Sequence, residues 1–242
     1  RPFRAPHHTV SVQALTGGGR RPKPGEISLA TGGILFLDEF PEFSRAALET
    51  LRQPLEEREV TVSRVEASVT YPANFQLVAA MNPCPCGHFP DRSRCRCTDG
   101  QITRYLQKVS GPMLDRIDIC VEASSITYGD IRSSGNNESS REIRARVEQA
   151  RKIQGERIAG ENIRCNGEMS GRHIRKFCGL GREEEKFMEE IFKKLALSAR
   201  MHDRILKVAR TTADLAEEEK IRLADLCEAV SYVKSRDKFW GN

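Results

Sequence analysis

Two short, mainly apolar runs, each followed at once by polar residues, constrain the fold of this chain most. The first, Gly33–Leu37, leads into Asp38 and Glu39, and the second, Phe75–Met81, ends at Asn82. Runs of this length without alternation are typical of strands buried on both faces of a parallel sheet. Since ligands of open α/β sheets bind at the carboxyl ends of the strands, the three polar residues are expected along one such edge.

The segments around these runs predict the rest of an α/β domain. Ser44–Glu57 has helical spacing with Ser44 as its N-cap, and Pro54 should kink or shorten that helix. Val60–Arg64 and Ala67–Tyr71 alternate like the two strands of a hairpin. The other predicted segments are a mostly irregular stretch over residues 1–32, a helix starting at Thr103–Val109 and a third strand at Ile117–Val121.

The pattern changes after residue 125. Residues 133–140 form a polar linker rich in Ser and Asn, and from Arg141 onward only helical periodicity remains. The predicted helices cover residues 141–157, 171–178, 182–195, 198–217 and 221–236. We therefore predict an α/β core over 1–125 and a linker with a smaller, all-helical domain over 126–242.

Composition and charge narrow the class of protein. The 242 residues carry a net charge of +5, and five basic residues precede the first acid, Glu26. This excess suits a polyanion partner and equally an ordinary solvated surface. No apolar run is long enough for a membrane helix, so we expect a cytoplasmic protein without a membrane partner. The N-terminus has neither Met nor a secretory signal, which suggests that the sequence begins inside a domain.

Four of the eight cysteines lie within fourteen residues, at Cys84, Cys86, Cys95 and Cys97. Two close pairs of thiolates are a ligand set that Zn²⁺ prefers, because zinc takes four soft ligands in a tetrahedron. Free thiols, a disulfide or an iron–sulfur cluster remain as alternatives, since Cys-x-Cys is a tighter spacing than Cys-x-x-Cys. His88 is a further ligand candidate, although an exposed loop histidine is the simpler interpretation.

The polar residues at the strand ends suit phosphoryl chemistry. Asp38 would hold Mg²⁺ at nucleotide phosphates while Glu39 polarises the attacking water, and Asn82 would orient that water or sense the γ-phosphate. Arg116, between Asp115 and Asp118, would reach the γ-phosphate of a neighbouring subunit. The plainer alternatives are strand-ending turns for the first three residues and a local Arg–Asp ion pair for Arg116.

The chain also resembles the magnesium-chelatase-like AAA+ ATPases of the ComM/YifB type. The segments that carry the resemblance are Phe3–His8, Gly25–Ala30, Gly33–Phe40, Ala80–Gly87, Gly111–Asp118, Leu197–Arg200 and Ile205–Leu215. They run in order through nearly the whole chain. The resemblance implies an AAA+ parallel-sheet core, truncated at its N-terminus, followed by a helical lid domain.

By position, the resemblance makes Asp38 and Glu39 the Walker B pair, Asn82 sensor 1, Arg116 the arginine finger and Arg200 sensor 2. Arg204 and Arg210 lie on the same predicted helix as Arg200, and a solvated or salt-bridged arginine is the alternative there. The chain departs from the family in lacking the Gly-x-x-x-x-Gly-Lys-[Ser/Thr] phosphate-binding loop anywhere in its sequence. We therefore expect ATP hydrolysis, with ATP and Mg²⁺, only from the complete protein, and none from this chain alone.

Three functions follow as hypotheses. The first is a homo-oligomeric ring ATPase, expected to be a hexamer, that remodels or branch-migrates DNA during recombination and natural transformation, with the basic segment before Glu26 and the hairpin around Arg64 facing the DNA. The second is a motor subunit of a metal chelatase that drives Mg²⁺ insertion into a porphyrin. The third is a non-catalytic, zinc-stabilised interaction module. The cysteine-rich insert after Asn82 favours the first over the second.

Overall fold

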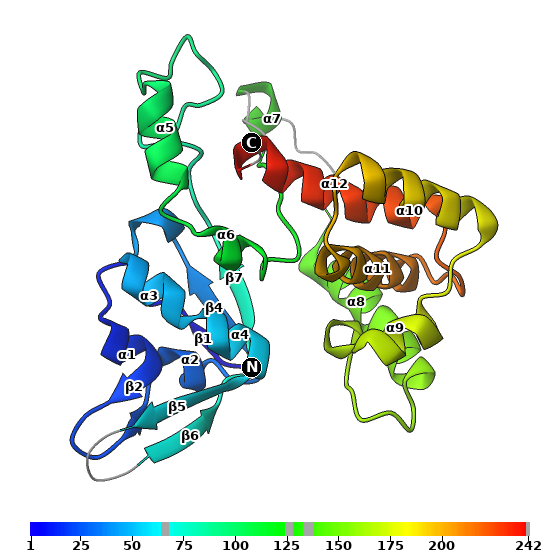
Figure 1. The fold of residues 1–242 in the computed structure, drawn as a ribbon, viewed down its shortest axis with the longest axis horizontal. Coiled ribbons are helices and arrows are strands. Elements are labelled where there is room, and N and C mark those ends of the chain that lie inside the picture. Colours follow the sequence, from blue (N-terminus) through cyan, green and yellow to red (C-terminus); the bar gives the residue numbers. More distant parts are fainter. Residues whose placement is uncertain (64–67, 124–127, 133–137, 241–242) are drawn as a thin grey trace. The chain divides into compact units, whose positions relative to one another are not determined.

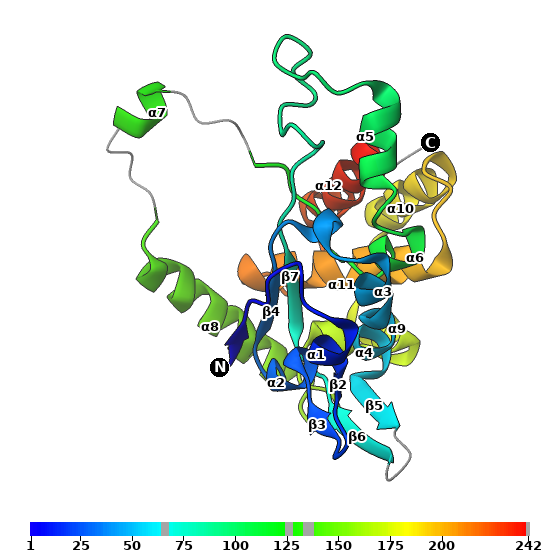
Figure 2. The same ribbon diagram turned by 90° about the vertical axis from the view of Figure 1, so that its left-hand side faces the viewer.

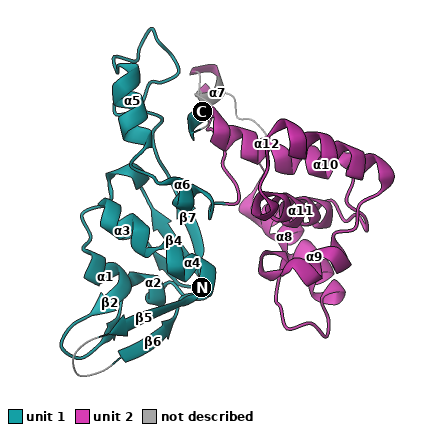
Figure 3. Ribbon diagram, in the orientation of Figure 1, with its two compact units in different colours: residues 1–117, 239–242 teal, residues 118–238 magenta. Residues whose placement is uncertain are grey.

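The structure of the chain is a computed structural model that describes residues 1–63, 68–123, 128–132 and 138–240. It divides into two compact units, one of residues 1–117 with 239–242 and the other of residues 118–238 (Figure 3). The first is an α/β unit and the second, in its described part, is helical. An α/β core with a parallel sheet followed by a helical region is thus confirmed.

Unit 1 is built around a three-stranded parallel sheet in the order β1-β4-β7 (Figure 1). The strands are β1 (Phe3–Arg4), β4 (Ile34–Leu37) and β7 (Gln76–Ala79). Leu35 pairs with Arg4 on one side and with Leu77 on the other. All three strands therefore end at the same edge of the sheet, as Figure 2 also shows for β4 and β7.

Short helices and two small hairpins surround this sheet. The helical elements are α1 (Val12–Thr16), α2 (Glu26–Leu29), the 3-10 turn η1 (Phe40–Glu42), α3 (Arg45–Thr50), α4 (Arg52–Glu57), α5 (Asp99–Leu106) and α6 (Gly111–Leu114). The hairpins pair β2 (Gly17–Gly18) with β3 (Lys23–Pro24), and β5 (Glu59–Ser63) with β6 (Ser68–Pro72), both antiparallel. Arg64, around which the second hairpin was predicted, lies outside the described residues.

One face of the sheet carries the hydrophobic core. Leu35 and Leu37 of β4 are fully buried and pack with residues of α1, α2 and α3. The other face is much less covered, since Phe3 is 62% and Val78 37% exposed, with Phe3 stacked on Phe36. The expectation of burial on both faces is therefore wrong for β7, because its outward-facing Val78 stays partly exposed.

The helix predicted at Ser44–Glu57 forms as α3 and α4, which meet at Leu51. The hydroxyl of Ser44 accepts a hydrogen bond from the backbone N–H of Ala47, as an N-cap does. The break comes three residues before Pro54. Proline has no backbone N–H to donate, and its ring clashes with the carbonyl four residues earlier. Both the cap and the interruption are confirmed.

Unit 2 is a helical bundle closed around its own core. Its helices are α7 (Tyr128–Arg132), α8 (Ser140–Arg157), the 3-10 turn η2 (Asn166–Glu168), α9 (Gly171–Phe177), α10 (Arg182–Lys194), α11 (Ala199–Leu215) and α12 (Leu223–Trp240), the last two residues of which belong to unit 1. Ile205, Ala209 and Leu226 are at most 1% exposed in its centre. All five predicted helices are present.

Three predictions for the first half need correction. Ile117–Val121 forms no strand: Ile119 is 52% and Val121 70% exposed, and no neighbouring strand pairs with them among the described residues. The third strand of the sheet is instead Phe3–Arg4, inside a stretch predicted to be mostly irregular. The helix predicted from Thr103 begins at Asp99, because Thr98 and Gln101 form a capping box ahead of it.

Candidate functional site

Asp38 and Glu39 leave the carboxyl end of β4 at the shared edge of the sheet. The strand pairing continues beyond them, since the backbone N–H of Phe40 donates to the carbonyl of Ala80 at 3.0 Å. The N–H of Glu39 donates to Oδ1 of Asp38 at 2.9 Å, which leaves Oδ2 without a hydrogen bond among the described residues. An exposed carboxylate oxygen at this edge is a ligand that Mg²⁺ accepts.

Glu39 adopts an unusual backbone conformation. Its φ of 52° and ψ of 44° lie in the left-handed region, which is uncommon for a residue with a side chain. Such conformations persist only where the surroundings fix them, and here hydrogen bonds from Phe40 and from Glu42 hold both sides of the turn. The Glu39 side chain is 57% exposed, and its Oε2 lies 2.8 Å from Nδ1 of His8.

His8 is a site residue that the sequence reasoning missed. It lies inside one of the segments that carry the family resemblance, but nothing in its local pattern connects it with Glu39. The signal that would have found it is the strand at Phe3–Arg4, because its pairing with β4 brings the chain after it to the same edge.

Asn82 follows β7 at the same edge, but its side chain lies near Gly87 of the loop that carries the four clustered cysteines. A methyl group placed on Gly87 would lie 3.8 Å from both Cγ and Oδ1 of Asn82, so its side chain lies against the start of the cysteine loop. Among the described residues no hydrogen bond joins Asn82 to Asp38 or Glu39. Asn82 therefore follows the strand to the predicted edge, and the neighbour recorded for its side chain is Gly87 rather than a carboxylate.

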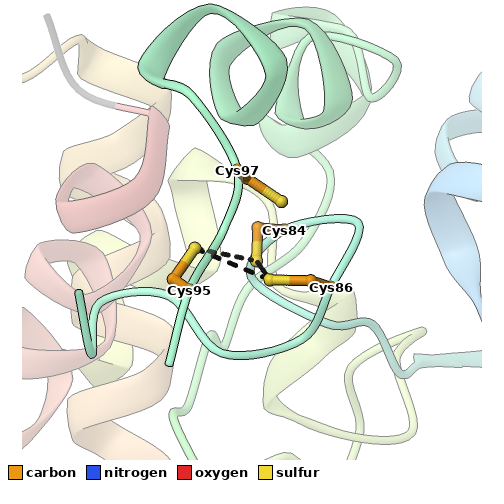
Figure 4. A group of neighbouring side chains, drawn as sticks. All are labelled: Cys84, Cys86, Cys95 and Cys97. Carbon is orange, nitrogen blue, oxygen red and sulfur yellow. Dashed lines mark hydrogen bonds between the residues drawn. The ribbon is translucent and has the colours of Figure 1, made fainter. Parts of the chain in front are cut away.

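The four clustered cysteines converge on one point (Figure 4). Their sulfur atoms all lie within 4.8 Å of one another, and those of Cys84, Cys86 and Cys95 are 3.4 to 3.8 Å apart. A tetrahedral site with metal–sulfur bonds of about 2.3 Å requires sulfurs about 3.8 Å apart. Three of the sulfurs are thus close to tetrahedral separations, and the sulfur of Cys97 lies near enough to complete the set.

The backbone of the loop prepares one thiol for ionisation. N–H groups of His88 and Arg96 hydrogen-bond to Cys86, and the first of these contributes most to lowering the pKa of the Cys86 thiol to about 6. Burial raises the pKa of the Cys97 thiol to about 11 when no metal is present. A bound cation would favour the thiolate of both residues, since a metal-coordinating thiol is deprotonated.

The cysteine loop is anchored on α5. Thr98, next to Cys97, caps that helix, and Cys84 is fully buried in a small core with Ile102 and Tyr105. Burial, together with smaller contributions from the negative charges of Glu42, Cys84 and Glu39, raises the pKa of Tyr105 to about 12. Tyr105 therefore lies within electrostatic reach of both the cysteine cluster and the Glu39 carboxylate.

Arg116 makes its contacts within unit 1. Its guanidinium donates to the carbonyls of Arg52 at 3.1 Å and Pro112 at 2.6 Å, and it forms an ion pair with Glu56. The side chain is 13% exposed, whereas that of Glu56 is 47% exposed. The local ion pair considered for Arg116 exists, but its partner is Glu56 rather than Asp118, which pairs with Arg204 at 2.8 Å.

Three arginines of α11 differ in their surroundings. Arg200, in the first turn, is exposed, while the Arg204 side chain is only 10% exposed beside Asp118. Arg210 is buried and binds Asp214 and the carbonyls of Glu218 and Glu219. Of the three, only Arg200 is exposed.

None of the helices in the described part of the chain combines the length and the apolar sequence needed to cross a bilayer.

Two family models match the chain in succession. Residues 1–131 match the model described as magnesium chelatase, subunit ChlI, and residues 137–233 match the model of the C-terminal part of that subunit. The first covers unit 1 with its sheet and cysteine loop, and the second covers most of the helical unit.

Individual relatives are similar over almost the whole chain. Competence protein ComM of Haemophilus influenzae is 48% identical over 233 residues, which is 96% of this chain and 45% of that protein. Proteins named YifB from Salmonella typhimurium and from Escherichia coli are each 46% identical over the same lengths. The chain spans a little under half the length of these relatives. With both halves matched in order, the chain belongs to the family of the magnesium chelatase subunit ChlI.

Proposed function

We propose that this chain supplies the acidic side of the nucleotide site in a ring-forming AAA+ ATPase. Below, the term "complete protein" means a polypeptide that contains this chain together with a phosphate-binding loop. In it, residues 1–125 form part of the AAA+ core and residues 126–242 the linker and lid. The observation that carries the proposal is the parallel register of β1, β4 and β7, which supports a polar edge with Asp38, Glu39 and Asn82.

Each residue of the site has a separate role in this proposal. Asp38 offers its open Oδ2 to Mg²⁺, which would neutralise charge on the phosphates when bound. Glu39 accepts a hydrogen bond from the attacking water and so orients it. The water oxygen then forms a bond to the γ-phosphorus while the bond between that phosphorus and the ADP oxygen breaks. The proton leaves with the phosphate. Asn82 orients the same water from the end of β7.

Two arginines would complete the site. Arg116 would reach the γ-phosphate bound by a neighbouring subunit after giving up its ion pair with Glu56 and its hydrogen bonds to the carbonyls of Arg52 and Pro112. Arg200, exposed in the first turn of α11, would contact nucleotide from the lid as sensor 2.

The proposal makes a clear demand of the chain by itself. Without the Gly-x-x-x-x-Gly-Lys-[Ser/Thr] loop there is no cradle for the β- and γ-phosphates. Purified chain should release no phosphate from ATP above the rate of a no-protein blank, whereas complete protein should turn over. Robust hydrolysis by the chain alone would refute the proposal that it supplies only the acidic side of the nucleotide site.

The metal in the cysteine cluster is proposed to be zinc. Four thiolates within 4.8 Å of one another suit Zn²⁺, which needs no redox change and closes its coordination sphere in structural sites. Because Gly87 of the same loop lies against Asn82, the metal would keep the loop in place behind the sensor residue. The role is structural rather than catalytic, since four protein ligands leave no open position.

DNA is the proposed substrate of the complete protein in the cytoplasm. The support is the similarity to a protein named for competence, over 96% of this chain. We propose that the ring, a hexamer, remodels or branch-migrates DNA during recombination, with the basic segment before Glu26 facing the DNA. Binding of a labelled duplex junction should weaken steeply between 50 and 200 mM salt, since each phosphate contact releases counterions. An affinity for DNA that does not depend on the salt concentration would argue against this substrate.

A chelatase motor is the second candidate, and the description of the family model favours it. It predicts that a porphyrin raises ATP turnover by the complete protein, while DNA does not. A third candidate is a non-catalytic module held together by zinc, and the four-cysteine cluster is its support. It predicts complete protein with bound zinc and no turnover under any of these conditions.

A further inference from the structure

We propose that the loop of the four clustered cysteines, residues 84–97, binds the phosphate backbone of DNA through Arg94, Arg96 and His88. This inference rests on the proposed function, which supplies DNA as the ligand, and it adds a contact separate from the basic segment before Glu26. Its evidence is also separate. It comes from a hollow in the loop, from the charges around that hollow and from the contacts that fix the loop.

The loop forms an open hollow from its own residues. The hollow has a volume of about 480 Å³. The residues that line it are Cys86, His88, Ser93, Arg94 and Arg96. Two guanidinium groups and an imidazole therefore surround the hollow, and no acidic residue of the described chain lines it. Walls of this kind attract anions from solution.

The acid of the loop is occupied by a turn of the loop itself. Asp91 is the only acidic residue between Cys84 and Cys97 in the sequence. Its Oδ1 accepts hydrogen bonds from the backbone N–H of Ser93 at 2.9 Å and from the Ser93 hydroxyl at 2.6 Å. These bonds lower the pKa of Asp91 most, and the charge of Arg94 lowers it least. Asp91 thus stabilises the turn more than it neutralises Arg94.

The three arginines of the loop have different surroundings. Arg92 forms an ion pair with Asp99 and donates to the carbonyl of Cys97 at 3.3 Å, so its charge is already balanced. Arg94 and Arg96 are exposed, and neither forms an ion pair with a carboxylate among the described residues. Two cations therefore remain at the hollow for an anionic ligand.

Contacts within the loop hold the basic residues at the hollow. The backbone N–H groups of His88 and Arg96 both hydrogen-bond to Cys86, so the two residues leave the backbone around one sulfur atom. The guanidinium of Arg92 lies 5.0 Å from the centre of the Phe89 ring and fixes the loop further. Because the backbone around the hollow is already ordered, binding an anion there costs less conformational entropy than binding it to a flexible segment.

Phosphodiester groups suit this arrangement. A guanidinium presents its N–H donors in a planar fork that matches two oxygens of a phosphate. Among the described residues no Phe, Tyr or Trp lines the hollow, so it offers no such platform on which a base could stack. Contacts to phosphate carry no sequence information, and we therefore expect the loop to bind DNA of any base sequence.

The first arm of the test asks whether the two arginines serve the metal instead. Four thiolates around Zn²⁺ keep a net negative charge, which nearby cations would balance. Since Arg94 and Arg96 are exposed and their charges are screened by salt, we expect the double variant Arg94→Ser with Arg96→Ser to keep about one zinc per chain by elemental analysis. Loss of most of the zinc would assign the arginines to the metal site and overturn the inference.

The second arm measures binding of the complete protein, without nucleotide, to a labelled duplex junction between about 50 and 200 mM salt. The double variant should bind roughly 10-fold more weakly at the lowest salt concentration. Its plot of log K against log salt should be less steep by about 2, since each lost phosphate contact removes about 0.9 from the slope. Arg141→Ser with Arg144→Ser is the matched control, because it removes the same charge from exposed positions of α8. The control should stay within about twofold of wild type, and equal weakening in both double variants would overturn the inference.

Arg20→Ser with Arg21→Ser, in the basic segment before Glu26, separates the inference from the proposed substrate. If this pair weakens DNA binding while the double variant of the loop binds as the wild type does, the inference fails and DNA remains the proposed substrate. If the wild-type complete protein has no measurable affinity for the junction even at the lowest salt concentration, the proposed substrate fails and the inference fails with it.

Discussion

Arg210 and Asp214, one turn apart on α11, form an ion pair inside the core of unit 2, with the two side chains 3% and 0% exposed. Nε of Arg210 donates to Oδ1 of Asp214 at 3.1 Å, and Asn166 donates to Oδ2 at 2.8 Å. Arg157 contacts the same carboxylate. Because Arg210 is committed to this buried ion pair, Arg200 remains the residue that we propose as sensor 2.

Removing the shared carboxylate should destabilise unit 2 severely. Asp214→Ala leaves Arg210 buried without its counter-ion, and such losses typically cost about 3 to 5 kcal/mol. In urea titrations monitored by circular dichroism, we expect the helical unit of the variant to unfold at a clearly lower urea concentration than that of the wild type. Asp203→Ala, at a half-exposed position on the same helix, should change the free energy of unfolding by less than about 0.5 kcal/mol. Equal effects of the two substitutions would contradict the structure.

The cysteine cluster should hold one zinc per chain. Protein purified without chelator should contain about one equivalent by elemental analysis, and Cys95→Ser should lose most of it because three thiolates bind zinc far less tightly than four. Cys227→Ser provides the control, since Cys227 is exposed and distant from the cluster in sequence. Full metal content in Cys95→Ser would exclude the assigned ligand set.

The buried Cys178 should make unit 2 sensitive to alkali. Burial raises the pKa of its thiol from 9.0 to about 11, so the folded state keeps the proton when the unfolded state has lost it. The stabilising contribution is therefore complete below pH 9 and is lost as pH rises from 9 to 11. The loss amounts to about 2 to 3 kcal/mol at the upper end.

Cys178→Ala isolates this contribution from the other groups that titrate in the same range. The variant is expected to be less stable at pH 7, because it loses buried volume beside Met169. Its stability should fall less steeply than that of the wild type between pH 9 and pH 11. Parallel pH profiles would mean that the thiol ionises without penalty in the folded state.

Periodicity alone predicted the elements that are long or strongly patterned. β4, β7, the hairpin β5–β6 and the five helices from residue 140 onward all formed close to the expected bounds. The carboxyl-edge placement of Asp38 and Asn82 followed from the same patterns, since parallel strands share an edge. The cysteine cluster could also be predicted, because four ligands within fourteen residues can meet within a single loop.

The failures concern segments whose structure depends on distant partners. Phe3–Arg4 is a strand only because β4 offers it an edge, and two residues carry no pattern of their own. Ile117–Val121 has strand-like residues but no such edge, and its side chains remain exposed. For the same reason the partners of Arg116 and Glu39 could not be read from the sequence, since Glu56 and His8 are brought to them by the fold.

The measurement closest to the central claim is ATP turnover by complete protein carrying Glu39→Gln, compared with Glu42→Gln. The two glutamates flank the same turn, but Glu42 pairs with Lys108 at the surface and is assigned no role in the reaction. Replacing the residue that polarises the water should lower kcat about 100-fold or more while ATP binding persists, and Glu42→Gln should remain near wild type. Turnover by Glu39→Gln within a few-fold of wild type would contradict the assignment of this sheet edge as the site of ATP hydrolysis.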